Sequence, residues 1–268
     1  MLTHTTRCVA LLAILLSTLL FGCQTTPFPS QAIPPLHVVS YNIKHGLGMD
    51  GKVDLERTRD VLSALDADLI ALQEVDERAR RSGGIDQAAW FGDELGMQSA
   101  FGAFMDFQGG RYGLALLSRH QIVSHEVWRL PDGNEPRVAL AARIRPEQGP
   151  EFTAVVVHFD WVKDDTYRFA QASETIDRIR TLDTPWIVLG DFNDTPGSRT
   201  MDAFHAIADE ATKPEGATKT FPSIEPRMEI DFILAGPTSR WDIGAATVID
   251  ETAASDHRPV VAELTPTP

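Results

Sequence analysis

The sequence predicts an α/β domain in which two packed β-sheets are flanked by helices. Runs of β-branched and aromatic residues, typical of buried strands, alternate with segments whose apolar residues recur at helical spacing. The stretch from Leu114 to Ile144 has only strand-like runs and turns, and the closing part from Thr218 to Leu264 has the same character. A chain that mixes these two patterns favours two sheets with helices outside them.

The N-terminus has the layout of an export signal. Residues 9–21 are almost wholly apolar, follow Arg7 and stop at Gly22-Cys23. This run is too short to span a bilayer comfortably and matches the apolar region of a secretory signal. Leu20-Phe21-Gly22-Cys23 resembles a bacterial lipoprotein signal, in which the cysteine is lipidated and becomes the new N-terminus. We expect residues 1–22 to be removed and Cys23 to carry the lipid, although an ordinary secretory signal or an uncleaved anchor stays open.

A proline-rich, polar segment follows at residues 23–35, and we interpret it as an extended tether. With Cys8 lost in the signal and Cys23 acylated, the mature chain would have no thiol for a disulfide, for zinc or for nucleophilic catalysis. The chemistry of the domain at 36–268 would then depend on oxygen and imidazole groups.

Within the domain, strands and helices follow in order. The spacing of Leu55, Thr58, Leu62 and Leu65 predicts a helix over 53–65, and the same criterion predicts one over 164–182. We expect strands at 36–43, 68–73, 152–158 and 185–190 around these helices. Between them, strands at 114–118, 122–130 and 138–144 are separated only by turn residues, which suggests antiparallel pairing.

The charge of the chain bears on its partners. With 24 basic and 38 acidic residues the formal charge is −14, and loss of Arg7 would make it −15. Such a surface repels polyanions, whose non-specific binding comes mostly from Lys and Arg. This counts against a tight nucleic-acid binder, but it does not exclude a nuclease, because a bound cation and local arginines can override the global field in a cleft.

Polar side chains stand where the predicted strands end or begin. They are Asn42, Glu74, His158, Asp191, Asn193, Asp231, Asp256 and His257. Strand ends held by a sheet framework can direct side chains from distant parts of the chain into one cleft. Carboxylates, amides and imidazoles can bind a hard divalent cation and move protons. Each residue alone has an ordinary reading as a turn residue or surface charge, but the ordered set favours an active site.

These motifs resemble those of the endonuclease/exonuclease/phosphatase superfamily of metal-dependent phosphoesterases. The similarity covers nearly all of the domain and rests on His158 and six motifs: Ser40-Tyr41-Asn42, Leu72-Gln73-Glu74, Tyr112 to Arg119, Gly190-Asp191-Phe192-Asn193, Ile230-Asp231-Phe232-Ile233, and Ser255-Asp256-His257-Arg258-Pro259. The resemblance implies a four-layer α/β sandwich with the cleft at one end of the two sheets.

The resemblance also implies roles for the site residues. Glu74 would be the principal ligand of Mg²⁺ (or Mn²⁺), with Asn42 beside it and Asp256 near the same or a second cation. Asp191 and Asn193 would position and deprotonate the attacking water. His158, and His257 oriented by Asp231, would hydrogen-bond the phosphate oxygens on which charge accumulates.

Further residues could contact the substrate phosphate: Lys44, Arg81, Tyr112 and Arg137. The arginines could equally be surface ion-pair partners. The deoxyribonuclease branch of the superfamily has a glutamate that orients the histidine matching His158, but no carboxylate occurs around Gly109 to Gly113. The partner of His158 therefore stays open, with Asp160 as the one candidate.

We expect a Mg²⁺-dependent hydrolase of a phosphodiester or phosphomonoester, with a lipid head group or small phosphoester favoured as substrate. We also expect a monomer, lipid-anchored in the bacterial cell envelope and facing the periplasm or exterior. One alternative is an envelope nuclease acting on DNA or RNA, which would share the same catalytic residues. The other is a non-catalytic envelope lipoprotein that uses the cleft to bind a partner.

Overall fold

The strands and helices of the computed structural model, which describes residues 2 and 33–267, follow the predicted alternation. The strands are β1 Leu36–Asn42, β2 Leu69–Glu77, β3 Gln98–Phe107, β4 Gly110–Ser118, β5 Gln121–Arg129, β6 Val138–Arg145, β7 Phe152–His158, β8 Trp186–Asp191, β9 Asp209–Glu210, β10 Asp231–Gly236, β11 Trp241–Val248 and β12 Val260–Pro266. The α-helices are α1 Leu55–Ala64, α2 Gln87–Leu95, α3 Thr166–Ile179 and α4 Arg199–His205, and short 3₁₀ turns lie at Lys44–Gly46, Arg80–Ser82 and Thr238–Arg240.

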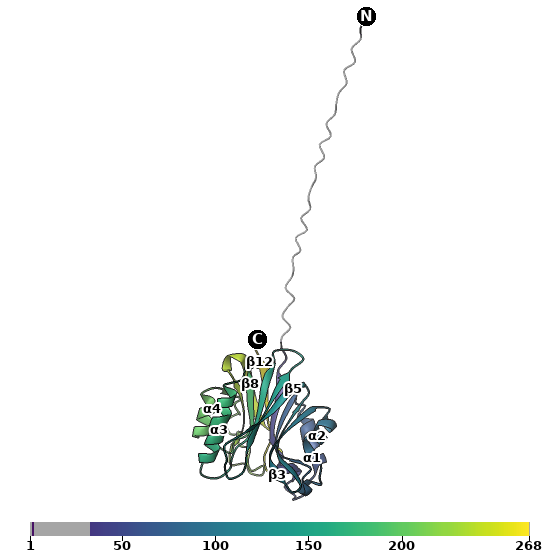
Figure 1. Cartoon of the computed structure of the whole chain (residues 1–268), viewed down its shortest axis with the longest axis vertical. Helices are drawn as coiled ribbons and strands as arrows, with labels where there is room; N and C mark the ends of the chain where they lie inside the picture. The colour runs from purple at the N-terminus through teal and green to yellow at the C-terminus, as the bar shows by residue number, and fades with distance from the viewer. Residues whose placement is uncertain (1, 3–32, 268) are drawn as a thin grey trace. The chain divides into compact units, whose positions relative to one another are not determined.

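The strands form two six-stranded mixed sheets. One has the order β11-β12-β1-β2-β4-β3 and the other the order β5-β6-β7-β8-β10-β9. Within the first sheet β1 and β2 are parallel, and within the second β7 and β8 are parallel. The sheets lie between two helix pairs, α1 with α2 on one side and α3 with α4 on the other (Figure 1). This is the predicted four-layer α/β sandwich.

Three apolar clusters fill the spaces between these layers. In β7, Ala154 and Val156 face the central cluster between the sheets, whereas Val155 and Val157 face the cluster that includes Ile176 of α3. A third cluster joins the first sheet to α1 and α2. Strands buried on both faces are apolar at consecutive positions, which explains why these segments read as continuous runs. Burial of each large apolar side chain stabilises the fold by about 1.5–3 kcal/mol.

The predicted helices are confirmed with shorter ends. The helix expected over 53–65 begins after Asp54, whose side chain accepts a hydrogen bond from the backbone N–H of Arg57. Such a cap satisfies one of the backbone donors that the first helical turn leaves free. The helix expected over 164–182 occupies Thr166–Ile179.

One expected strand pairing is wrong. We predicted that the three strands between Leu114 and Ile144 pair in sequence, but only β5 and β6 do so. Strand β4 is already paired with β2 on one edge and β3 on the other, so it has no free edge for β5. The chain crosses to the second sheet at Arg119-His120, and β5 becomes an edge strand there.

Apart from Leu2, the expected signal at 1–22 and most of the tether, including Cys23, lie outside the residues that the structure describes. Among the described helices, none is long and apolar enough to cross a membrane.

Candidate active site

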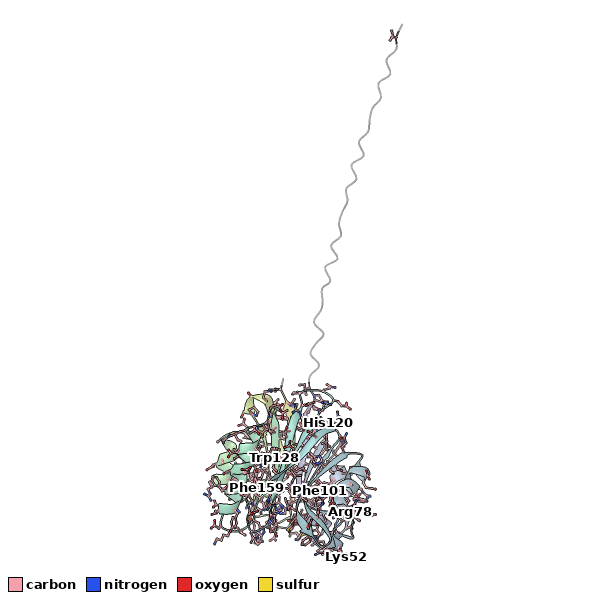
Figure 2. The ribbon with its side chains drawn as sticks, in the orientation of Figure 1. Lys52, Arg78, Phe101, His120, Trp128 and Phe159 are labelled. Carbon is pink, nitrogen blue, oxygen red and sulfur yellow. The ribbon has the colours of Figure 1, made fainter. Side chains whose placement is uncertain are left out.

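Four of the predicted site residues meet because of strand direction. Strands β1 and β2 are parallel, with β1 ending at Asn42 beside the β2 segment that carries Glu74, while β7 and β8 are parallel and end at His158 and Asp191. The carboxyl ends of both pairs lie at the same end of the sandwich. In Figure 2 this end lies near the labels Lys52, which follows β1, and Arg78, which follows β2. The opposite end lies near His120, in the turn between β4 and β5.

An open cleft of about 460 Å³ lies among these strand ends. Its lining includes most of the predicted residues: Glu74, Tyr112, Arg137, His158, Asp191, Asn193, Asp256 and His257. Residues that the sequence did not single out as site residues also line it: Glu135, Trp161, Phe221, Met228 and Ile230. Three more predicted residues do not line the cleft but form hydrogen bonds to residues that do: Asn42, Asp231 and Lys44.

Glu74 owes its position to a β-bulge. Strand β2 does not end at Glu74 as predicted but continues to Glu77, and its pairing with β4 skips a residue between Gln73 and Val75. Glu74 has a left-handed backbone with φ of 60°. A bulge leaves one residue out of the alternation of strand faces and can redirect its side chain. Glu74 is thereby directed into the cleft instead of into a packed layer of the core.

Asp191 is the centre of the polar network. Its Oδ1 accepts a hydrogen bond from the backbone N–H of Asn193 at 2.9 Å, and its Oδ2 accepts one from Asn42 Nδ2 at 3.2 Å. The same Oδ2 lies 3.4 Å from His158 Nε2 and 3.6 Å from His257 Nε2. Burial raises the pKa of Asp191 to about 7, against the opposing effect of His257. A carboxylate whose pKa lies near neutrality is suited to accept a proton from water.

His257 is held by a second buried carboxylate. Its Nδ1 lies 3.0 Å from Asp231 Oδ2, and the register of β8 and β10 places Asp231 directly opposite Asp191. Burial alone would lower the pKa of His257, but the negative charges of Asp231 and Asp191 outweigh it and raise the pKa to about 10. His257 is therefore an imidazolium at neutral pH, with both ring nitrogens as donors.

His158 has a different partner from the one that the sequence suggested. Its Nδ1 faces Arg137 Nη1 at 3.3 Å. Asp160 is not its partner, because the Asp160 carboxylate accepts hydrogen bonds from the backbone N–H groups of Asn134 and Val162. Burial, together with the positive charges of Arg137 and His257, holds the pKa of His158 well below its usual range. The ring is neutral, accepts at Nδ1 and therefore donates at Nε2.

Only two of the four predicted phosphate contacts line the cleft. Arg137 and Tyr112 line the cleft, but Arg81 does not. Arg81 Nε and Nη2 each donate a hydrogen bond of 2.8 Å to the carboxylate of the fully buried Asp76. The Arg81 Cζ lies 5.0 Å from the centre of the Tyr112 ring. Lys44 Nζ is bonded to Asp256 Oδ2 at 2.6 Å. Arg81 and Lys44 are thus engaged by protein carboxylates.

Two sets of side chains in the described part of the chain could hold a divalent cation. Ligand atoms of Asp191, Asp231 and His257 lie within 4.8 Å of one another, but all three side chains are buried, and His257 Nδ1 already bonds Asp231. Glu74 and Asp256 form the second set, since both line the open cleft and carboxylate oxygens suit Mg²⁺ or Mn²⁺. One oxygen of Asp256 is bonded to Lys44. Asn42 turns its amide nitrogen toward Glu74 and its Oδ1 toward the Lys44 backbone N–H, so in this orientation it presents no ligand oxygen there.

A family model described as the Endonuclease/Exonuclease/phosphatase family matches residues 39–257. No curated protein sequence matches the chain.

Among solved structures, an endonuclease/exonuclease/phosphatase from Beutenbergia cavernae has a TM-score of 0.73 and 21% identity, and the match covers 87% of this chain and 72% of that one. A mannosyl-6-phosphatase from Bacteroides thetaiotaomicron has a TM-score of 0.70 and 20% identity, covering 86% and 99%. The catalytic domain of human Nocturnin with bound sulfate has a TM-score of 0.69 and 21% identity, covering 87% and 94%. At these identities the similarity shows a shared fold.

Proposed function

Because the chain belongs to the Endonuclease/Exonuclease/phosphatase family, whose members are hydrolases of phosphoesters, we propose that it hydrolyses a phosphomonoester or phosphodiester with Mg²⁺ or Mn²⁺. The observation that carries the proposal is the position of Asp191. It is buried, its pKa lies near neutrality, and it stands between two imidazole donors at the floor of the cleft. A purely structural carboxylate would not need that combination.

Glu74 and Asp256 would hold the cation, which when bound polarises a phosphate oxygen and supplies positive charge for the transition state. Asp191 would take the proton of the attacking water. Asn42 and the Asn193 backbone N–H fix the Asp191 carboxylate, so its orientation is set before the substrate binds.

The two imidazoles would act on the phosphate oxygens that gain charge. His257 Nε2–H and His158 Nε2–H point toward the same place, next to Asp191 Oδ2. Hydrogen-bond donors fixed around developing charge contribute on the order of 3 kcal/mol each, by analogy with oxyanion holes. Asp231 keeps His257 charged and oriented, and Arg137 keeps His158 in the tautomer that donates from Nε2.

For the substrate we propose a small phosphoester or a lipid head group. The formal charge of −14 repels long polyanions, and the open cleft of about 460 Å³ has the size of a small-ligand site. We further propose a monomer anchored through Cys23 in the bacterial cell envelope, because the apolar run before Cys23 has the layout of a lipoprotein signal.

The test is a substrate panel assayed with Mg²⁺ on the purified protein: small phosphomonoesters, a chromogenic phosphodiester, phospholipid head-group esters, and plasmid DNA. We expect turnover of a small ester or head group that is lost in Asp191→Asn and kept in Asp209→Asn, a matched change at an exposed position outside the cleft. Nicking of plasmid without turnover of small esters would favour the nuclease instead. Equal inactivity of wild type and Asp191→Asn on every ester would point to a non-catalytic binding protein.

A further inference from the structure

Glu135 and Trp161 are among the cleft residues that have no part in the proposed chemistry. Glu135 lies in the β5–β6 loop and Trp161 in the β7–α3 loop, and both line the cleft. Trp161 is 58% exposed, although a large apolar ring is usually more buried than this. The Glu135 side chain is 37% exposed and lies beside the buried Arg137. An exposed ring and a carboxylate at the mouth of a cleft are available to the part of a substrate that does not react.

The two loops are tied together by Asp160, which is fully buried. Its Oδ2 accepts hydrogen bonds from the backbone N–H groups of Asn134 at 2.6 Å and Glu135 at 3.4 Å, while its Oδ1 accepts one from Val162. Arg168 donates to the backbone carbonyls of Asp160 and Val162. These bonds fix the backbones of both loops, so the loops hold Glu135 and Trp161 in defined positions.

The chemistry of the pair indicates what it can bind. Glu135 Oε2 lies 3.2 Å from Nη2 of the buried Arg137, which holds the carboxylate in place while the Glu135 side chain stays 37% exposed. A fixed, exposed carboxylate can accept hydrogen bonds from ligand hydroxyl groups. Because Arg137 already neutralises Glu135, the ion pair presents no net negative charge to a ligand ammonium. The face of a tryptophan ring packs well against the C–H face of a saturated ring.

We propose that Glu135 and Trp161, with Arg137 holding Glu135 in place, form a subsite for a hydroxylated ring, such as a pyranose, attached to the reacting phosphate. The ring would lie against Trp161, and its hydroxyl groups would bond Glu135. This inference rests on the proposed function, since it assigns the alcohol part of the same phosphoester.

The test uses the full chain and a series of phosphate esters: methyl phosphate, cyclohexylmethyl phosphate, a hexopyranose 6-phosphate and choline phosphate. Methyl phosphate lacks a ring, and cyclohexylmethyl phosphate has a ring without hydroxyl groups. Binding is measured by calorimetry with Mg²⁺ present, and turnover is measured in parallel. The variants are Trp161→Ala and Glu135→Gln, with Tyr167→Ala as the matched control, because Tyr167 is an exposed aromatic residue on α3 that does not line the cleft.

We expect the hexose phosphate to bind most tightly, with Trp161→Ala weakening it about tenfold and leaving methyl phosphate within about twofold. Glu135→Gln should weaken the hexose phosphate more than the cyclohexyl ester, and Tyr167→Ala should change neither. Tighter binding of choline phosphate, or equal hexose affinity in wild type and Trp161→Ala, would overturn the subsite. If either of these two results is found and methyl phosphate is still hydrolysed, only the subsite is contradicted and the proposed function is not. Binding without turnover of any ester would contradict the function and keep the subsite.

Discussion

Arg137 Nη1 lies 3.3 Å from His158 Nδ1, and this contact takes the place of the carboxylate that we looked for in the sequence. A carboxylate partner would accept a proton from Nδ1 and favour a charged ring. Arg137 donates to Nδ1 and adds positive charge, so it selects the neutral ring with its proton on Nε2. Arg137 is buried, and its Cζ packs 4.8 Å over the Phe104 ring, which fixes the guanidinium in place.

Replacing Arg137 should therefore disturb His158 more than the substrate. We expect Arg137→Met to reduce kcat by about 10–100-fold, the usual effect of losing a residue that orients a catalytic group. The ¹⁵N chemical shifts of the His158 ring should show a mixture of tautomers in the variant. Arg129→Met, at an exposed ion pair on β5, is the matched control. A rise in KM alone, with unchanged His158 shifts, would make Arg137 a phosphate-binding residue instead.

The Asp191 carboxylate should reduce the stability of the fold in return for activity. Its pKa is raised from 3.8 to about 7, so its favourable contribution to stability is fully present below pH 3.8 and is lost as the pH rises through 7. Asparagine cannot ionise, and we expect Asp191→Asn to unfold at a higher temperature than wild type at pH 8 without metal, by about 1 kcal/mol in free energy. Turnover should fall on the order of 10³-fold.

Thermal unfolding at pH 5 is the internal control for that prediction, since wild type has by then regained most of the stability that ionisation of Asp191 costs it, so the advantage of the variant should be smaller than at pH 8. A variant less stable than wild type at both pH values would mean that Asp191 is a structural residue.

His257 should make the fold less stable in alkaline solution. Its pKa is raised from 6.5 to about 10 by Asp231 and Asp191, so its contribution to stability is fully present below pH 6.5 and declines as the pH rises through 10. Chemical denaturation between pH 6.5 and 10 should show this decline, and Asp231→Asn should flatten it. An equal slope in wild type and Asp231→Asn would show that Asp231 does not hold the charge on His257.

Much of the site could be predicted from the sequence because strands buried on both faces are continuous apolar runs. The apolar runs of β1, β7 and β8 locate Asn42, His158 and Asp191 at strand ends, and the direction of parallel strands then brings these residues together. Glu74 was predicted because it also follows an apolar run, but its strand continues for three more residues. The bulge at Glu74 leaves no pattern in the sequence, because it depends on how β2 pairs with β4.

The partners of the arginines could not be predicted, since they depend on loops that meet only in the folded chain. Arg137 was predicted only as a possible phosphate contact, and nothing in the sequence around it indicates that it reaches His158 on β7. Similarly, Arg81 was a candidate for contact with the substrate phosphate, but its side chain bonds Asp76, five residues earlier. Trp161 gave no signal, because a single tryptophan in a loop has no periodicity.

The central claim is that Glu74 and Asp256 hold a divalent cation at the same cleft in which Asp191 activates water. The most direct measurement is a Mg²⁺ titration of phosphoester turnover for wild type, Glu74→Ala and the exposed control Glu147→Ala. We predict that a chelator abolishes turnover, that Glu74→Ala needs at least about tenfold more Mg²⁺ for half-maximal rate, and that the control matches wild type. Undiminished turnover in the chelator, or superimposable titrations for wild type and Glu74→Ala, would contradict it.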